Sequence, residues 1–242
     1  NKSVLIISNE NLPYVLKNLE PKVKSRLILI YDEVHRLGSP KNVATLEGLS
    51  NDIEYVLGLS ATPEREYDEE GTAFLERNVG PVIMQFDLKN AIAKHILAPF
   101  NYIPLYYESS FEDKEKIKAV HALKAKRDKD GPPMSKEEFW IKLSQVYKTS
   151  KVKLDVFDRF IKDNQNLLTR CIIFVDTKEY ALLVLDKVHK YRFDFHTYVD
   201  NDDSSILKDF ATGELECLVA CHRLSEGIDI RSLNNVFFIF IR

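Results

Sequence analysis

The residues best suited to chemistry follow directly on a short apolar run. Leu27–Tyr31 is apolar on both faces, as a strand inside a parallel sheet must be, and Asp32-Glu33-Val34-His35 comes next. Groups at the carboxyl ends of parallel strands face the ligand crevice, so Asp32 and Glu33 are expected to point into a site. Asp32 could hold Mg²⁺ through water, and Glu33 could orient or deprotonate an attacking water. On spacing alone, an ordinary acidic turn explains these residues equally well.

A second set of polar side chains stands at the end of the next predicted strand. The stretch Leu57-Gly58-Leu59-Ser60-Ala61-Thr62-Pro63 ends in small hydroxyl residues and a proline that stops the strand. Ser60 and Thr62 are therefore expected beside the acidic pair, where they could offer short hydrogen-bonding groups. Taken alone, this stretch is only a strand-to-turn signal.

A third candidate set lies far along the chain, in the loop Ala220–Ile230. Gly227 permits close approach of a ligand to the backbone, and Asp229 is a lone carboxylate between Ile228 and Ile230. A β-turn with a solvated acidic residue would give the same pattern. Glu226 completes this set of candidates.

The elements that must position these residues alternate between strand-like and helical patterns. Short apolar runs separated by helical patterns predict an α/β fold with parallel sheets covered on both sides. The alternation fills residues 1–98, stops over the helical stretch Phe111–Asn166, and returns to the end of the chain. We expect two doubly wound domains, 1–98 and 99–242, with 111–166 a helical insertion or linker packed on the second. The expected strands include Val4–Ile7, Leu27–Tyr31, Tyr55–Leu59, Cys171–Val175, His196–Val199, Leu215–Ala220 and Val236–Ile241.

Charge is uneven along the chain although the whole protein is nearly neutral. The 34 basic and 37 acidic residues give 34 − 37 = −3, which excludes a globally basic nucleic-acid binder. The run Lys114–Lys129 is nevertheless basic, with seven Lys and Arg residues against Glu115 and Asp128. It is either a solvated helix face or a contact surface for a phosphate backbone, in which Lys124, Lys126 and Arg127 are the candidate residues.

Composition places the chain among globular proteins of a reducing compartment. It contains 45% hydrophobic and 29% charged residues, far from disordered sequences. An odd number of cysteines suits a cytoplasmic protein, or a nuclear one in a eukaryote. Cys217 and Cys221 fit small apolar strand residues better than zinc ligands, since no second Cys/His pair stands at metal spacing. The apolar runs have the length of strands, so we expect no membrane partner.

Together these pieces resemble the superfamily 2 helicases and translocases. Asp32-Glu33-Val34-His35 resembles the DEAD/DEAH box (motif II) and Ser60-Ala61-Thr62 resembles motif III. Cys171–Thr177 resembles motif IV, and Ser225–Ile230 resembles motif V. The motifs occur in the family order, and Gly58–Arg65 with Glu226–Ile230 most resembles restriction-enzyme translocation subunits and double-strand DNA translocases.

The resemblance implies two RecA-like domains that close on ATP and Mg²⁺ and move along a nucleic acid, with DNA favoured over RNA. Asp32 would engage the metal through water, and Glu33 would polarise the water that attacks the γ-phosphate. His35, counted with these two as a catalytic residue, would join Ser60 and Thr62 in coupling the nucleotide state to domain closure. The residues implied to face the nucleotide cleft are Glu226, Gly227 and Asp229, and those implied to contact nucleic acid are Ser8, Asn9 and Arg223.

Departures from the family pattern imply that both domains are truncated. The phosphate-binding pattern Gly-x4-Gly-Lys-Ser/Thr is missing, because the first glycine is Gly38, beyond motif II. Motif VI would follow Val236–Ile241, where the sequence stops at Arg242. We therefore expect a nearly inert fragment of an active parent, which could carry nuclease or specificity subunits or domains. The alternative is a non-catalytic binding or scaffold protein that kept the helicase fold.

Overall fold

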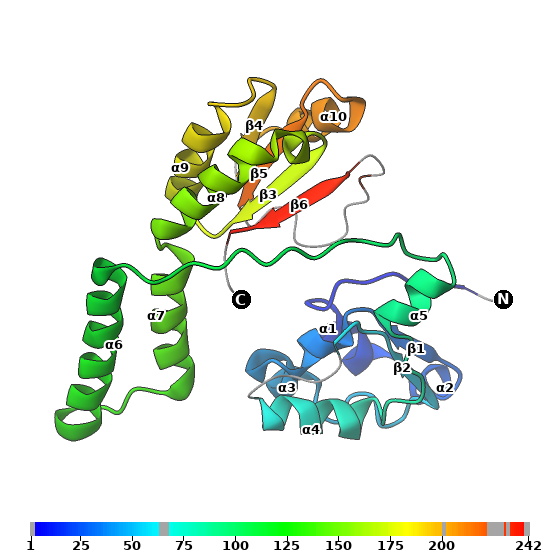
Figure 1. Cartoon of the computed structure of the whole chain (residues 1–242). Coiled ribbons are helices and arrows are strands. Elements are labelled where there is room, and N and C mark those ends of the chain that lie inside the picture. Colours follow the sequence, from blue (N-terminus) through cyan, green and yellow to red (C-terminus); the bar gives the residue numbers. More distant parts are fainter. Residues whose placement is uncertain (1–2, 63–67, 200–201, 222–229, 231–232, 240–242) are drawn as a thin grey trace. The chain divides into compact units, whose positions relative to one another are not determined.

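The computed structural model describes residues 3–62, 68–199, 202–221, 230 and 233–239. The chain divides into two compact units, Asn1–Phe100 and Asn101–Arg242. The division lies two residues beyond the boundary expected from the sequence. Each unit is α/β with parallel strands, as predicted (Figure 1).

The first unit is built around two parallel strands, β1 (Ile28–Tyr31) and β2 (Tyr55–Gly58), with Tyr31 opposite Gly58. Buried Leu16, Leu37 and Phe74 come from the surrounding helices and form one core with the inner face of the strands. The outer face is exposed and includes Ile28 and Ile30. The helices of this unit are α1 (Leu12–Asn18), α2 (Pro21–Lys24), η1 (Val34–Gly38), α3 (Pro40–Leu46), α4 (Glu69–Asn78) and α5 (Leu88–Ala93).

The strand predicted over Val4–Ile7 is wrong. These residues form no strand, and Val4 and Ile6 are each 93% exposed. An apolar β-branched run has the propensity for a strand, but it becomes one only where a neighbouring strand offers hydrogen bonds. In the described part of the first unit, β1 pairs with β2 alone.

The second unit contains a four-stranded parallel sheet in the order β4-β5-β3-β6. Alternate residues of the strands point to opposite faces, where separate helices cover them. Ile173 and Val219 pack with α8 and α9, whereas Ile172 and Leu218 pack with Phe210 of α10. The doubly wound arrangement is therefore confirmed for this unit. Its strands are β3 (Cys171–Val175), β4 (Phe195–Tyr198), β5 (Cys217–Cys221) and β6 (Asn235–Phe238), and the covering helices are α8 (Val152–Asp163), α9 (Lys178–Val188) and α10 (Ser205–Thr212).

The segment before this sheet is helical throughout, but its parts belong to different structures. Helices α6 (Phe111–Asp130) and α7 (Lys136–Lys148) lie side by side as a hairpin (Figure 1). Helix α8 instead belongs to the core of the sheet, where the ring of Phe157 meets that of Phe237 edge-on at 5.3 Å. The short helix η2 (Gln165–Leu168) leads into β3. Only the hairpin therefore stands apart from the sheet.

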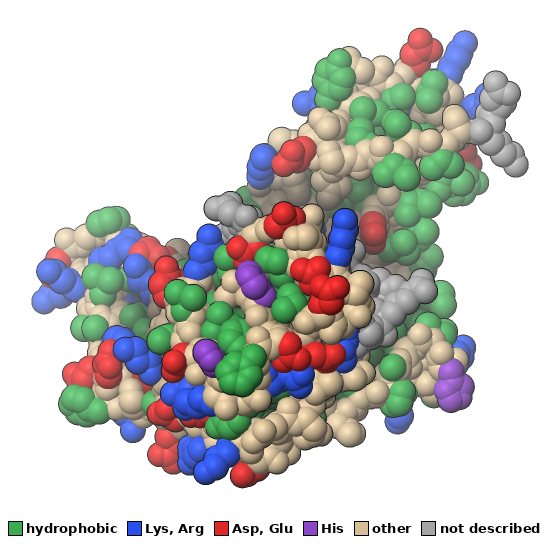
Figure 2. All heavy atoms as spheres, turned by 90° about the horizontal axis from the view of Figure 1, so that it is seen from above, with side chains coloured by type: hydrophobic (Ala, Val, Ile, Leu, Met, Phe, Trp, Pro, Cys, Tyr) green, Lys and Arg blue, Asp and Glu red, His purple; other side chains and the backbone are tan. Residues whose placement is uncertain are grey.

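The three cysteines are strand residues, as the sequence indicated. Cys171 lies in β3, Cys217 and Cys221 lie in β5, and all three are free thiols buried in the sheet. On the face shown in Figure 2, basic and acidic side chains are interspersed. Within the described residues, no helix combines the length and hydrophobicity needed to cross a bilayer.

Candidate active site

The acidic pair stands where the sequence places it, at the carboxyl end of β1. The backbone joins this position to the end of β2, because Leu59 donates its amide hydrogen to the Tyr31 carbonyl (2.8 Å) and Val34 donates to the Leu59 carbonyl (2.9 Å). The two segments that carry polar side chains are thus held next to each other.

The turn between Asp32 and Val34 has an unusual backbone. Glu33 lies in the left-handed region, with φ 48° and ψ 49°, which is uncommon for a residue other than glycine. Its amide donates to Oδ1 of Asp32 at 2.9 Å, which gives the turn a local partner. Such a conformation directs two neighbouring carboxylates differently from a regular helix or strand, and it is typical of functional sites. Asp32 is exposed and the Glu33 side chain is 44% exposed, so both can meet a ligand from solvent.

His35 connects the two sets of candidate residues. Its Nδ1 lies 3.0 Å from Oγ of Ser60 and 3.4 Å from Oε2 of Glu33. Ser60 Oγ also accepts the amide hydrogen of Thr62 at 3.1 Å. A change in the charge or position of Glu33 can therefore alter the turn after β2 through the imidazole ring of His35.

Tight packing beneath the site favours a glycine in β2. A Cβ at Gly58 would come within 3.0 Å of both Cγ atoms of Val34 and of Cγ1 of Val79. Val34 stands between the catalytic candidates Glu33 and His35 in the sequence. The absence of a side chain at position 58 therefore lets Val34 pack closely against β2.

The remaining predicted residues are separate from this cluster. Ser8 and Asn9 are exposed in the turn before α1, where Asn11 Nδ2 donates to Ser8 Oγ at 3.1 Å. The predicted nucleotide-cleft and loop residues lie outside the described part of the chain: Arg223, Glu226, Gly227 and Asp229.

The basic run divides into two kinds of side chain. Arg127 Nη1 lies 2.6 Å from Glu138 Oε1, and its Nε donates to the Pro132 carbonyl at 3.0 Å. Lys124 pairs with Asp128 at 2.7 Å. Lys124 and Arg127 thus make contacts inside the hairpin, whereas Lys126 is exposed. Sequence spacing alone did not separate them.

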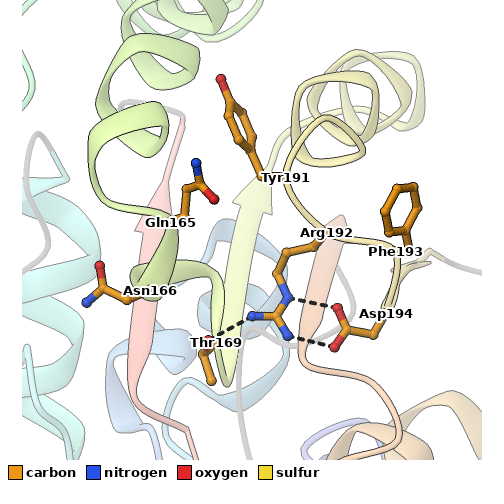
Figure 3. Close-up of a pocket in the computed structure, with 7 residues that line it drawn as sticks. All are labelled: Gln165, Asn166, Thr169, Tyr191, Arg192, Phe193 and Asp194. Carbon is orange, nitrogen blue, oxygen red and sulfur yellow. Dashed lines mark hydrogen bonds and ion pairs between the residues drawn. The ribbon is translucent and has the colours of Figure 1, made fainter.

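A pocket of about 530 Å³ lies at the amino-terminal edge of the second sheet. Figure 3 shows Arg192 directed toward Asp194 and Thr169 within it. The guanidinium makes two bonds to the Asp194 carboxylate (2.7 and 2.6 Å) and one to Thr169 Oγ1 (2.7 Å). The central charge of this pocket is already paired, so its geometry indicates a structural clamp between η2 and β4.

The chemistry of the acidic turn fits Mg²⁺ held through water. Within the described ranges, no three or more His, Cys, Asp and Glu side chains converge as a complete metal site. Mg²⁺ needs no such cage, because it usually keeps several waters and takes one or two carboxylates. Asp32 offers one exposed carboxylate at a strand end, where a metal–nucleotide complex would be accessible.

The comparisons with known proteins locate one domain within the second unit. Residues 152–241 match the helicase conserved C-terminal domain. The matched region, which we call the helicase C-terminal domain, begins at α8 and includes the four-stranded sheet. The α6–α7 hairpin precedes it. No curated protein sequence matches the chain.

Several solved helicase structures are similar to the chain at low sequence identity. The Hef helicase domain of Pyrococcus furiosus has a TM-score of 0.47 at 16% identity, with 94% of this chain and 69% of that chain covered. Helicase Lhr of Mycobacterium smegmatis, bound to ssDNA and AMP-PNP, has a TM-score of 0.42 at 16% identity, with 95% and 27% covered. Dbp5 of S. cerevisiae, bound to RNA and ADP BeF3, has a TM-score of 0.32 at 13% identity, with 97% and 68% covered. The chain thus spans about a quarter of the length of Lhr.

Proposed function

We propose that this chain contains part of the ATP-hydrolysing machinery of a nucleic-acid helicase or translocase, with DNA the favoured nucleic acid. The observation that carries the proposal is the bridge from Glu33 through His35 to Ser60 at the carboxyl ends of β1 and β2. The helicase C-terminal domain at residues 152–241 supports the same interpretation.

Each side chain of the turn has a separate task in this proposal. Asp32 would hold Mg²⁺ through water, and the ion would neutralise charge on the phosphates of ATP. Glu33 would take up the proton of the attacking water at its carboxylate. His35 would hold Glu33 in position and would shift with it, which would change the contact of His35 with Ser60. Ser60 in turn accepts the amide hydrogen of Thr62 in the turn after β2.

The basic face of α6 would contribute to nucleic-acid binding. Lys126 is the member of the predicted set that remains exposed, while Lys124 and Arg127 would act indirectly by maintaining the hairpin. Contacts of this type are made to phosphates and depend weakly on base sequence.

Substitution of Asp32 tests the metal assignment. In the intact protein, Asp32→Asn removes the ligand charge while it keeps the side-chain size, so Mg²⁺-dependent ATP affinity should fall by about tenfold or more. Titration of a fluorescent ATP analogue with and without Mg²⁺ measures the effect, and Asp52→Asn, at an exposed carboxylate before β2, is the control. An equal affinity for wild type and Asp32→Asn would contradict the assignment and favour the non-catalytic scaffold.

A further inference from the structure

The base of the α6–α7 hairpin contains a buried polar network. Asp113, in the first turn of α6, is only 5% exposed, and Ser150, between α7 and α8, is 2% exposed. Ser150 Oγ donates to Asp113 Oδ2 at 2.7 Å. Tyr180, in the first turn of α9, donates its hydroxyl to the Ser150 carbonyl, also at 2.7 Å. This chain of hydrogen bonds, which we call the Asp113 joint, connects the hairpin to the helicase C-terminal domain.

The carboxylate at the centre of the Asp113 joint is held in its charged form. Burial alone raises the pKa of Asp113, but hydrogen bonds from Ser150 and Ser110 outweigh it and leave the pKa below its usual range. The Ser110 amide donates to Asp113 Oδ2 at 3.1 Å, and the Asp113 amide donates to Ser110 Oγ at 3.0 Å. Breaking this network would leave a buried charge short of partners, which is costly.

Two lysines add further contacts at the same base. Lys148, the last residue of α7, lies 2.8 Å from Asp176, which follows β3. Lys153 of α8 donates to the Ile239 carbonyl at 3.3 Å and faces the ring of Tyr107. Burial lowers the pKa of Lys153 to about 8, although the charges of Asp113 and Asp176 oppose this shift. The last residue of α7 and the segment before α6 thus contact the helicase C-terminal domain.

The outer end of the hairpin is closed by contacts of its own. Arg127 bonds Glu138 and the Pro132 carbonyl across the turn, and the Met134 amide donates to Asp128 Oδ1 at 3.2 Å. The rings of His121 and Phe139 meet edge-on at 5.1 Å between the helices. The hairpin is therefore braced along its length as well as at its base.

The exposed face of α6 is basic. Lysines at positions 114, 118, 126 and 129 are separated by 4, 8 and 3 residues, spacings that place them along one side of a helix. All four are exposed, and Lys118 pairs with Glu115 at 2.7 Å. Among the residues that the structure describes, no ion pair is seen for Lys114, Lys126 or Lys129. Such a row is complementary to a phosphate backbone.

We propose that the α6–α7 hairpin is a fixed arm, locked to the helicase C-terminal domain by the Asp113 joint, that holds this row of lysines in place for a nucleic-acid backbone. The inference that the arm binds nucleic acid rests on the proposed function, whereas the inference that the arm is fixed rests on the Asp113 joint alone. Asp113, Ser150 and Tyr180 are positioning residues, because they act through the hairpin.

A distance measurement tests the joint without any ligand. Spin labels at Lys129→Cys on the arm and Asp186→Cys on α9 can be attached selectively, since the native cysteines are buried. Electron double resonance should give one narrow distance distribution, and Ser150→Ala should at least double its width. Tyr180→Phe should broaden it less, and Ser144→Ala, on α7, is the matched control.

A broad distribution before substitution, or an unchanged width in both Ser150→Ala and Tyr180→Phe, would overturn the fixed arm. Circular dichroism verifies that each variant is folded.

Binding of a 20-nucleotide single-stranded DNA without ATP tests the partner. Lys126→Glu combined with Lys129→Glu should weaken affinity about tenfold and flatten its dependence on salt. Ser150→Ala releases the arm, so it should weaken affinity several-fold. Because the charge of the arm is unchanged, the dependence of affinity on salt should be preserved. Lys162→Glu, on the exposed side of α8, is the charge control. Unchanged affinity in the double variant overturns the nucleic-acid role of the arm, and it does so independently of ATP hydrolysis at Asp32 and Glu33.

Discussion

At the scale of single residues, His35 is the side chain through which the candidate site is connected. Its imidazole Nδ1 lies within 3.4 Å of an oxygen of Glu33 and within 3.0 Å of the hydroxyl of Ser60. His35 and Ser60 are 25 residues apart in sequence. The Ser60 hydroxyl thus adds a side-chain contact to the backbone hydrogen bonds that join the acidic turn to the end of β2.

Removal of that hydroxyl should uncouple the two turns. Ser60→Ala eliminates the contact with His35 and the acceptor of the Thr62 amide, but leaves Asp32 and Glu33 in place. We expect nucleotide affinity within about twofold of wild type and a loss of most of the stimulation of ATP hydrolysis by nucleic acid. Basal and stimulated rates of the intact protein measure this effect, with Ser25→Ala at the end of α2 as the control. Full stimulation in Ser60→Ala would show that His35 and Ser60 do not couple the site.

At the scale of elements, the position of the acidic turn depends on the close approach of β2 to Val34. The backbone bonds between Leu59, Tyr31 and Val34 hold the two strand ends together. The missing side chain at Gly58 permits that approach. The sheet therefore sets the geometry of the site through packing as well as hydrogen bonding.

Gly58→Ala should disturb this packing. Its Cβ would lie 3.0 Å from side-chain atoms of Val34 and Val79, and overpacking of this kind costs about 1–3 kcal/mol of unfolding free energy. Denaturant unfolding of the chain measures the loss of unfolding free energy in the first unit. Gly131→Ala, in the second unit, is the control, because its Cβ would meet its nearest neighbour, the Arg127 carbonyl oxygen, at an ordinary 3.8 Å. Equal stability of the two variants would contradict the packing argument.

The elements also show which parts of the structure the sequence could predict. The strands β1, β3 and β5 were predicted within about two residues, because apolar runs of that length suit a buried parallel sheet. The run Val4–Ile7 has the same composition but no strand partner among the described residues. Propensity is local, whereas pairing depends on the rest of the fold.

At the scale of the whole molecule, the two units differ in how completely the sequence predicted them. In the first, the ends of two apolar runs were enough to predict that Asp32, Glu33 and Ser60 lie at one edge of a sheet. In the second, the sheet was predicted, but the Asp113 joint was not, since Asp113 and Ser150 are 37 residues apart in sequence and Ser150 and Tyr180 are 30 apart. A capping pattern at Ser110 and Asp113 was the available local signal, and it indicates a helix start without showing what else the carboxylate binds.

Hydrolysis of ATP at the acidic turn, as proposed, is tested most directly at Glu33. Glu33→Gln keeps the size and hydrogen-bonding reach of the side chain but removes the proton acceptor. In the intact protein, ATP affinity should stay within about threefold of wild type, while nucleic-acid-stimulated turnover should fall by about 100-fold or more. Glu47→Gln, at the end of α3, is the control and should hydrolyse ATP at the wild-type rate. A Glu33→Gln protein that turns over ATP as fast as wild type would contradict the catalytic assignment.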